Sequence, residues 1–113
     1  MFSEKEKLVK IAEDRSVLFA LMGERDIVPI LVDGQSCLLI WYDESFYVVK
    51  NKCPHQGIKL TSGKCEDGKI LCPWHHYAFD LKTGKGAGLH LENYPVTEND
   101  SGIFVKMKFF SWF

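Results

Sequence analysis

Cys53-Pro54-His55-Gln56-Gly57 and Cys72-Pro73-Trp74-His75 are the two stretches that decide the character of this chain. Together they read C-x-H, sixteen intervening residues, then C-x-x-H. Each half offers one thiolate and one imidazole from a tight turn, and the proline after each cysteine restricts the backbone. Gly57 and Gly63 let the chain bend closely around a bulky inorganic group. The pattern predicts a metal site with these candidate ligands: Cys53, His55, Cys72 and His75.

A zinc-stabilised binding module is an alternative, because two cysteines and two histidines can hold zinc tetrahedrally. Common zinc fingers place both cysteines in one half of the motif and both histidines in the other. The single residue between Cys53 and His55 fits that arrangement poorly. A chain without any metal would need two similar proline-containing loops to arise by accident.

The two stretches resemble the cluster loops of the Rieske family of iron–sulfur proteins. Residues 53–57 look like its first loop, and residues 72–81 followed by Thr83-Gly84 look like its second. Weaker similarity extends through residues 46–49 and 94–96, and the first 35 residues carry almost none. The resemblance implies an all-β fold, a Rieske-like antiparallel β-sandwich with a small cluster-binding subdomain.

The resemblance also implies one [2Fe–2S] cluster as the cofactor. Cys53 and Cys72 would hold one iron, and His55 and His75 the other. Two ferric ions, two sulfides and two thiolates sum to zero, so reduction takes the site only to −1. A four-cysteine cluster goes from −2 to −3, which is harder, and histidine ligation therefore raises the reduction potential.

The implied function is soluble electron transfer, one electron at a time, from a flavin reductase as donor to an oxygenase as acceptor. Such a carrier is not itself an enzyme, and only His76 and His90 remain for any second iron site. The alternative is a small iron–sulfur subunit of a larger reductase. The sequence leaves the oligomeric state and the identity of both partners open.

Two departures from high-potential members of the family bear on the potential. Those members carry a disulfide between the loops, and the matching positions here are Ile58 and Trp74. They also place serine and tyrosine hydroxyls near the cluster, where this chain has Tyr77 and Phe79. Hydrogen bonds to the cluster stabilise the extra electron, so their loss predicts a potential near the lower limit of about −150 mV for Rieske centres.

Composition bounds the remaining possibilities. With 113 residues, 46% hydrophobic and 26% charged, the chain fits a single domain, 1–113, with the cluster-binding subdomain at about 51–81. A net charge of −1 gives no reason to expect nucleic acid as a partner. The charged start at residues 1–7 lacks a secretion signal, and no apolar run is long enough for a membrane span. We therefore expect a cytoplasmic protein with reduced thiols.

The rest of the chain predicts short β-strands separated by turns. Residues 16–22 are ambiguous between a helical turn and a strand. Pro29 places the strand at residues 27–32 at an edge or bulge, and residues 84–88 read as a flexible connection. The other predicted strands lie around residues 8–11 and at residues 37–42, 46–49, 70–71, 77–81, 94–97 and 103–110.

A few residues outside the motif invite weaker interpretations. His76 and His90 read as surface residues, Cys37 as a buried strand thiol and Cys65 as a turn residue, and nothing supports a redox pair of the two cysteines. Trp74 is expected to pack between the loops. The aromatic end, Phe109, Phe110, Trp112 and Phe113, is either a strand tucked onto the core or an exposed apolar patch.

The charges are unevenly distributed. Residues 50–86 contain seven lysines and three acids, a local charge of +4, so the remainder carries −5. A basic rim around the cluster could steer an acidic partner, or it could be an ordinary solvated surface.

Overall fold

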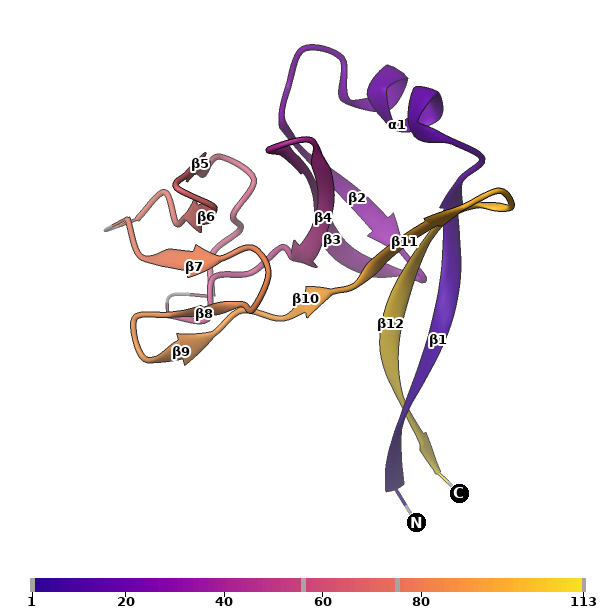
Figure 1. The fold of residues 1–113 in the computed structure, drawn as a ribbon. Coiled ribbons are helices and arrows are strands. Elements are labelled where there is room, and N and C mark those ends of the chain that lie inside the picture. Colours follow the sequence, from indigo (N-terminus) through magenta and orange to yellow (C-terminus); the bar gives the residue numbers. More distant parts are fainter. Residues whose placement is uncertain (1, 56, 75, 113) are drawn as a thin grey trace.

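The computed structural model describes residues 2–55, 57–74 and 76–112. Within them the chain forms antiparallel strands and one short helix (Figure 1). The elements are β1 (Phe2–Ala12), α1 (Arg15–Met22), β2 (Ile27–Val32), β3 (Gln35–Tyr42), β4 (Ser45–Lys50), β5 (Lys64–Glu66), β6 (Lys69–Leu71), β7 (Ala78–Asp80), β8 (Lys85–Gly86), β9 (Leu89–His90), β10 (Asn93–Tyr94), β11 (Val96–Asn99) and β12 (Gly102–Trp112). The all-β fold class is confirmed.

The two long terminal strands form a twisted ribbon. β1 pairs with β12 along nearly its whole length, from Phe2 opposite Trp112 to Ala12 opposite Ile103, and β11 adds a third strand on the other side of β12. Figure 1 shows that this ribbon carries both termini to the same end of the molecule.

The central sheet has the order β10-β4-β3-β2 and is buried on both faces at β3. Cys37 and Leu39 of β3 face one core, whereas Leu38 and Ile40 face a second. This double burial explains why β3 reads as a continuous apolar run rather than an alternating one. Pro29 lies on β2, an edge strand of this sheet, as its missing N–H predicts.

The first core lies between the terminal ribbon, the helix and the central sheet. Its buried members are Ala12, Leu18, Met22, Val28, Val32, Cys37, Leu39, Phe46, Val48, Tyr94, Ile103, Val105 and Met107. The second core lies on the other face of β3 and β4 and reaches into the segment that carries the motif. Its members are Leu38, Ile40, Val49, Cys53, Leu60, Ile70, Cys72, Phe79, Leu81 and Leu91. Both motif cysteines therefore belong to the second core.

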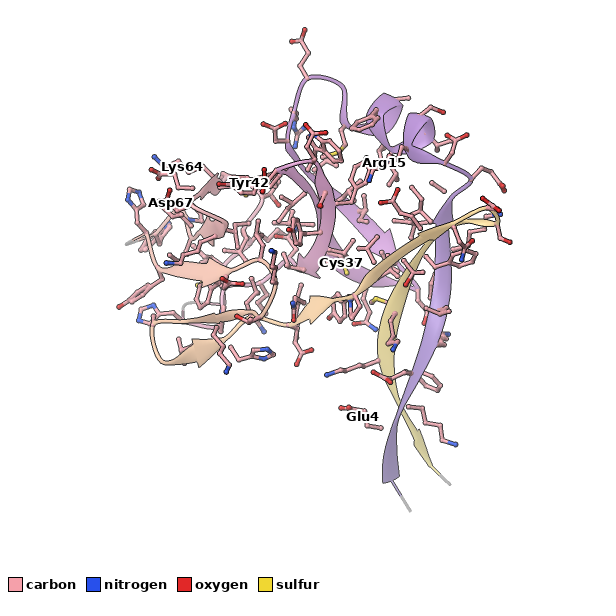
Figure 2. All side chains as sticks on the ribbon, in the orientation of Figure 1. Glu4, Arg15, Cys37, Tyr42, Lys64 and Asp67 are labelled. Carbon is pink, nitrogen blue, oxygen red and sulfur yellow. The ribbon has the colours of Figure 1, made fainter. Side chains whose placement is uncertain are left out.

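A small lobe carries the motif. The order β5-β6-β7 forms a three-stranded sheet, and β8 and β9 form a short hairpin beside it. The backbone N–H of Gly68 donates to the hydroxyl of Tyr42 at 3.0 Å, which ties the turn between β5 and β6 to the end of β3. Figure 2 shows Tyr42 next to this turn, where Asp67 and Lys64 are labelled.

Most predicted strands and turns are confirmed. The strand at residues 27–32 and the hairpin of β3 and β4 lie where expected. The turns at Asp33-Gly34 and Asp67-Gly68 take the left-handed backbone that favours these residues, with φ of 53° and 79° in the first and 51° and 75° in the second.

Two segments need comment: one that the sequence left ambiguous between helix and strand, and one that differs from its prediction. Residues 15–22 form a helix, and the carboxylate of Asp14 caps its start by accepting from the N–H groups of Ser16 and Val17 at 2.9 and 3.4 Å. The interpretation of residues 84–88 as a flexible connection was wrong. Ala87 and Gly88, with φ of 52° and 73°, form the tight turn between β8 and β9.

In the part of the chain that the structure describes, no helix combines the length and apolar character needed to cross a bilayer.

Candidate metal centre

The two motif loops are closed by the same backbone hydrogen bond. The N–H of Cys53 donates to the carbonyl of Ile58 at 2.7 Å, and the N–H of Cys72 donates to the carbonyl of Tyr77 at 2.8 Å. In both loops the bond links a cysteine to the fifth residue after it. In each loop, therefore, the backbone of the cysteine at the start contacts the backbone of the last residue.

The loops also share a backbone conformation at the fourth residue after the cysteine. Gly57 has φ of 71° and His76 has φ of 53°, both in the left-handed region. Glycine adopts this conformation without strain, and histidine is among the side chains that tolerate it best. The two halves of the motif thus share a closing hydrogen bond and a left-handed residue at the same position.

Both cysteines are fully buried, at 0% exposure. Burial raises the pKa of the Cys72 thiol, and the neighbouring Cys53 raises it further, while a backbone N–H at Trp74 acts in the opposite direction. Two adjacent thiolates in an apolar setting are unfavourable unless a cation lies with them. The pair has the chemistry of a soft metal site.

Both cysteines pack against apolar side chains of the second core. Cys72 follows β6, whose Ile70 pairs with Phe79 of β7, and all three side chains are fully buried. Such packing holds the sulfur atoms at a defined place, as a ligand site requires.

Asn51 braces the first loop, and sequence reasoning missed it. Its side chain is buried, at 5% exposure. Its Oδ1 accepts the N–H of Leu60 at 2.8 Å, and its Nδ2 donates to Thr61 Oγ1 at 2.9 Å. These bonds tie the start of the loop to residues 60–61. An asparagine before Lys-Cys carries no pattern that distinguishes a buried brace from a turn residue.

His55 lies at the surface beside the second loop. Its ring stacks on Tyr77 with the centroids 4.1 Å apart and the planes tilted by 39°. This contact joins the exposed part of the first loop to the end of the second. His75, the fourth candidate ligand, lies outside the described residues.

The structure thus brings together part of the expected ligand set. Cys53 and Cys72 are neighbours, and His55 is exposed next to the second loop. Among residues 2–55, 57–74 and 76–112, no three histidine, cysteine or acidic side chains converge closely enough to hold a metal ion by themselves. The complete ligand set stays a prediction.

The structure also tests the weaker interpretations of residues outside the ligand set. The interpretation of Cys65 as a turn residue was wrong, because Cys65 lies half-buried in strand β5, opposite Ile70 of β6. Cys37 is buried, and His76 and His90 are exposed, as predicted. The expectation that Trp74 packs between the loops was wrong, because Trp74 is 59% exposed. Burial raises the pKa of Cys37 to about 11, and Cys37 and Cys65 are free thiols.

Comparison with known proteins decides the family. A family model described as the Rieske [2Fe-2S] domain matches residues 8–97. The chain belongs to the Rieske [2Fe-2S] domain family. The match includes both loops and all four candidate ligands, and a Rieske domain holds one [2Fe–2S] cluster.

Several relatives of this Rieske domain are ferredoxins. The chain is 30% identical over 89 residues to the ferredoxin component of naphthalene 1,2-dioxygenase/salicylate 5-hydroxylase systems from Ralstonia sp., covering 75% of this chain and 86% of the relative. It is 31% identical over 85 residues to the ferredoxin component of the naphthalene 1,2-dioxygenase system from Pseudomonas putida, covering 75% and 77%.

A solved structure shares the fold. The ferredoxin of carbazole 1,9a-dioxygenase from Nocardioides aromaticivorans superposes with a TM-score of 0.70 at 24% identity, covering 88% of this chain and 96% of that one. The Rieske-like antiparallel architecture is therefore confirmed.

Proposed function

We propose that this chain is a ferredoxin that carries single electrons on one [2Fe–2S] cluster ligated by Cys53, His55, Cys72 and His75. The observation that carries the proposal is the pair of buried, adjacent cysteines at the bases of two loops closed in the same way. A cationic iron centre compensates two thiolates that the apolar core alone would disfavour.

Each residue of the proposed site has a different role. Cys53 and Cys72 anchor the cluster to the second core, and the cluster supplies one-electron chemistry when bound. His55 lies at the surface, so its imidazole offers a short path for an electron to a docked protein. Tyr77 holds the ring of His55 in place by stacking.

The proposed partners are a flavin reductase as electron donor and an oxygenase as acceptor. The relatives named above are ferredoxin components of dioxygenase systems, which supports this assignment. We infer that the chain has no substrate of its own. The loaded protein with a chemical reductant should therefore convert no aromatic substrate until an oxygenase is added.

We also infer a low potential for a Rieske centre. Phe79 is fully buried in the core next to Cys72 and has no hydroxyl with which to stabilise the extra electron. The midpoint should lie toward about −150 mV, the lower limit for such centres.

A reductive titration followed by electron paramagnetic resonance tests the function. The loaded protein should show the low average g-value of a reduced Rieske centre. His75→Ala should abolish this signal, whereas His76→Ala, which changes the exposed next residue, should keep it. An unchanged signal in His75→Ala would show that the ligand set is wrong. A colourless protein containing zinc would replace the proposal with the binding-module alternative.

A further inference from the structure

The acids of the motif lobe are turned away from the two loops or are already engaged. The carboxylate of Asp80 accepts the N–H groups of Lys82 and Thr83 at 2.8 and 2.9 Å, and Glu66 lies 3.5 Å from Lys64. Asp67 and Asp80 line a hollow that faces the turn between β3 and β4. The three acids of residues 50–86 therefore do little to neutralise the loop end.

Three exposed lysines lie around the loops without an ion pair among the described residues: Lys52, Lys59 and Lys85. Lys52 precedes Cys53, and its Cε lies 3.5 Å from where a Cβ on Gly57 would sit. Lys59 directly follows the first loop. These lysines add positive charge at the entrance of the first loop and just after its end.

The β8–β9 hairpin brings the third lysine to the same end. Gly86 approaches the carbonyl of Ala78 so closely that any Cβ there would clash, so the hairpin packs against the strand that leaves the second loop. A shallow hollow lined by Lys52, Gly57, His90 and Glu92 connects the hairpin to the first loop, and the carboxylate of Glu92 lies 4.0 Å from Lys108 Nζ. In Figure 1 this hairpin and strands β6 and β7 lie together at the left, away from the terminal ribbon of β1 and β12.

Apolar side chains are exposed at this end as well. Trp74 is 59% exposed on the second loop, and Leu89 is 37% exposed on the hairpin. An exposed aromatic anchor with charged residues around it is the usual anatomy of a protein docking site.

We propose that this end is a docking surface for a redox protein that presents an acidic face. We call it the basic tip, and it consists of Lys52, His55, Lys59, Trp74, Lys85 and Leu89. The inference rests on the proposed function, because it assumes that the two loops hold the redox centre. The tip contains three lysines and no acid, and it lies in a stretch, residues 50–86, that carries +4 against −5 for the remainder, so the tip should attract an acidic partner despite the net charge of −1.

Two double variants with the same net charge show whether an effect depends on where the lysines lie or only on how many are removed. The tip variant is Lys52→Gln with Lys85→Gln. The control is Lys5→Gln with Lys106→Gln, which removes two exposed lysines of β1 and β12 that form no ion pair with any residue the structure describes.

The first experiment measures binding without any electron transfer. On a sulfonate cation exchanger at pH 7.5, the loaded wild-type protein should be retained although its net charge is negative. The tip variant should elute at clearly lower salt than the control variant. Equal elution of the two variants, or passage of the wild type without retention, would overturn the basic tip.

The second experiment measures electron transfer to small probes by stopped flow. Raising the ionic strength from about 10 to about 200 mM should slow oxidation of the reduced protein by ferricyanide about tenfold, and should speed oxidation by the cationic tris(phenanthroline)cobalt(III) complex. The tip variant should lose most of both effects, and the control should keep them. Reversed salt effects in the wild type would overturn the basic tip while still supporting electron transfer.

The outcomes of the two proposals are distinguishable. A protein that reduces neither probe refutes the proposed function, and the ion-exchange result still decides whether the tip is basic. Co-sedimentation with phosphatidylserine vesicles that only the tip variant loses would show that the surface binds an anionic membrane, and would overturn the assignment of a protein partner.

Discussion

Gly57 and His76 hold the same position in their loops and have the same left-handed backbone, but only Gly57 is the residue type that adopts this conformation without strain. Their φ angles of 71° and 53° both lie in the left-handed region. A non-glycine residue there costs about 1–2 kcal/mol relative to the right-handed conformation. The first loop avoids that strain and the second carries it.

Changing each of these residues to alanine should therefore have different effects. Gly57→Ala should lower the free energy of unfolding by about 1 kcal/mol, because a Cβ at this φ is strained although it would meet only Lys52 Cε, at an ordinary contact distance of 3.5 Å. His76→Ala should change it by less than about 0.5 kcal/mol, since the strain is already present. Urea unfolding of the loaded protein, followed by its visible absorbance, measures both. Equal losses of unfolding free energy in the two variants would show that the left-handed backbone does not distinguish Gly57 from His76.

Asn51 supports the first loop through two hydrogen bonds, and their removal can be separated. Asn51→Ala leaves the N–H of Leu60 without its acceptor and should cost about 2 kcal/mol. Thr61→Val removes only the acceptor of Asn51 Nδ2 and should cost about 1 kcal/mol or less. The same urea midpoints test this order. A smaller loss for Asn51→Ala than for Thr61→Val would show that the N–H of Leu60 does not depend on Asn51.

Among the elements, α1 is too short to be stable by itself, so its packing must hold it. An isolated helix of eight residues is marginal in water. Leu18 is only 2% exposed and Met22 4%, and Arg15 binds Glu98 of β11 through two hydrogen bonds of 2.7 and 2.9 Å. The first core and this ion pair attach the helix to the ribbon.

One substitution at two positions of α1 tests this view. Leu18→Ala should cost about 2–4 kcal/mol, because it leaves a cavity in the first core. Leu21→Ala, at a residue that is 57% exposed, should cost about 0.5 kcal/mol or less. Thermal unfolding of the two variants gives the comparison. Similar losses would mean that helix propensity, and not burial, holds the element.

The elements that could be predicted from the sequence are those whose local chemistry agrees with their tertiary setting. β2, β3 and β4 combine β-branched or aromatic runs with aspartate-glycine turns or charged breaks. The helix stayed ambiguous because Val17 and Leu21 are apolar yet exposed, which blurs its periodicity. Asp14 was the cap signal that could have settled it.

The elements that were missed depend on contacts distant in the sequence. β1 extends far beyond its apolar residues because β12 pairs with it, although its first half alternates charges. The β8–β9 hairpin lies in a glycine-rich stretch and exists because Gly86 fits against Ala78. For the site, spacing predicted both cysteines and His55 as ligands, and the structure places Cys53 beside Cys72 and His55 beside the second loop, whereas no spacing pattern points to the supporting Asn51.

At the scale of the whole molecule, two cores built from strands of different length share β3. The first joins long strands, and the second includes β5, β6 and β7, each of three residues. Strands that short rarely form a stable sheet alone. We propose that residues 1–113 form one domain in which the cluster-binding subdomain, at about residues 51–81, depends on its metal.

Removing the cluster tests whether the small lobe depends on its metal. In the proposed ligand set an iron would join the buried Cys53 and Cys72, so the metal-free protein should lose a link between its two loops. Hydrogen exchange of the metal-free protein should show fast exchange of the amides of β5, β6 and β7, while β1, β3 and β12 keep most of their protection. Reconstitution with iron and sulfide should restore the slow exchange. Loss of protection along the whole chain would instead mean that the two cores unfold as one cooperative unit, and full protection without iron would mean that apolar packing alone orders the loops.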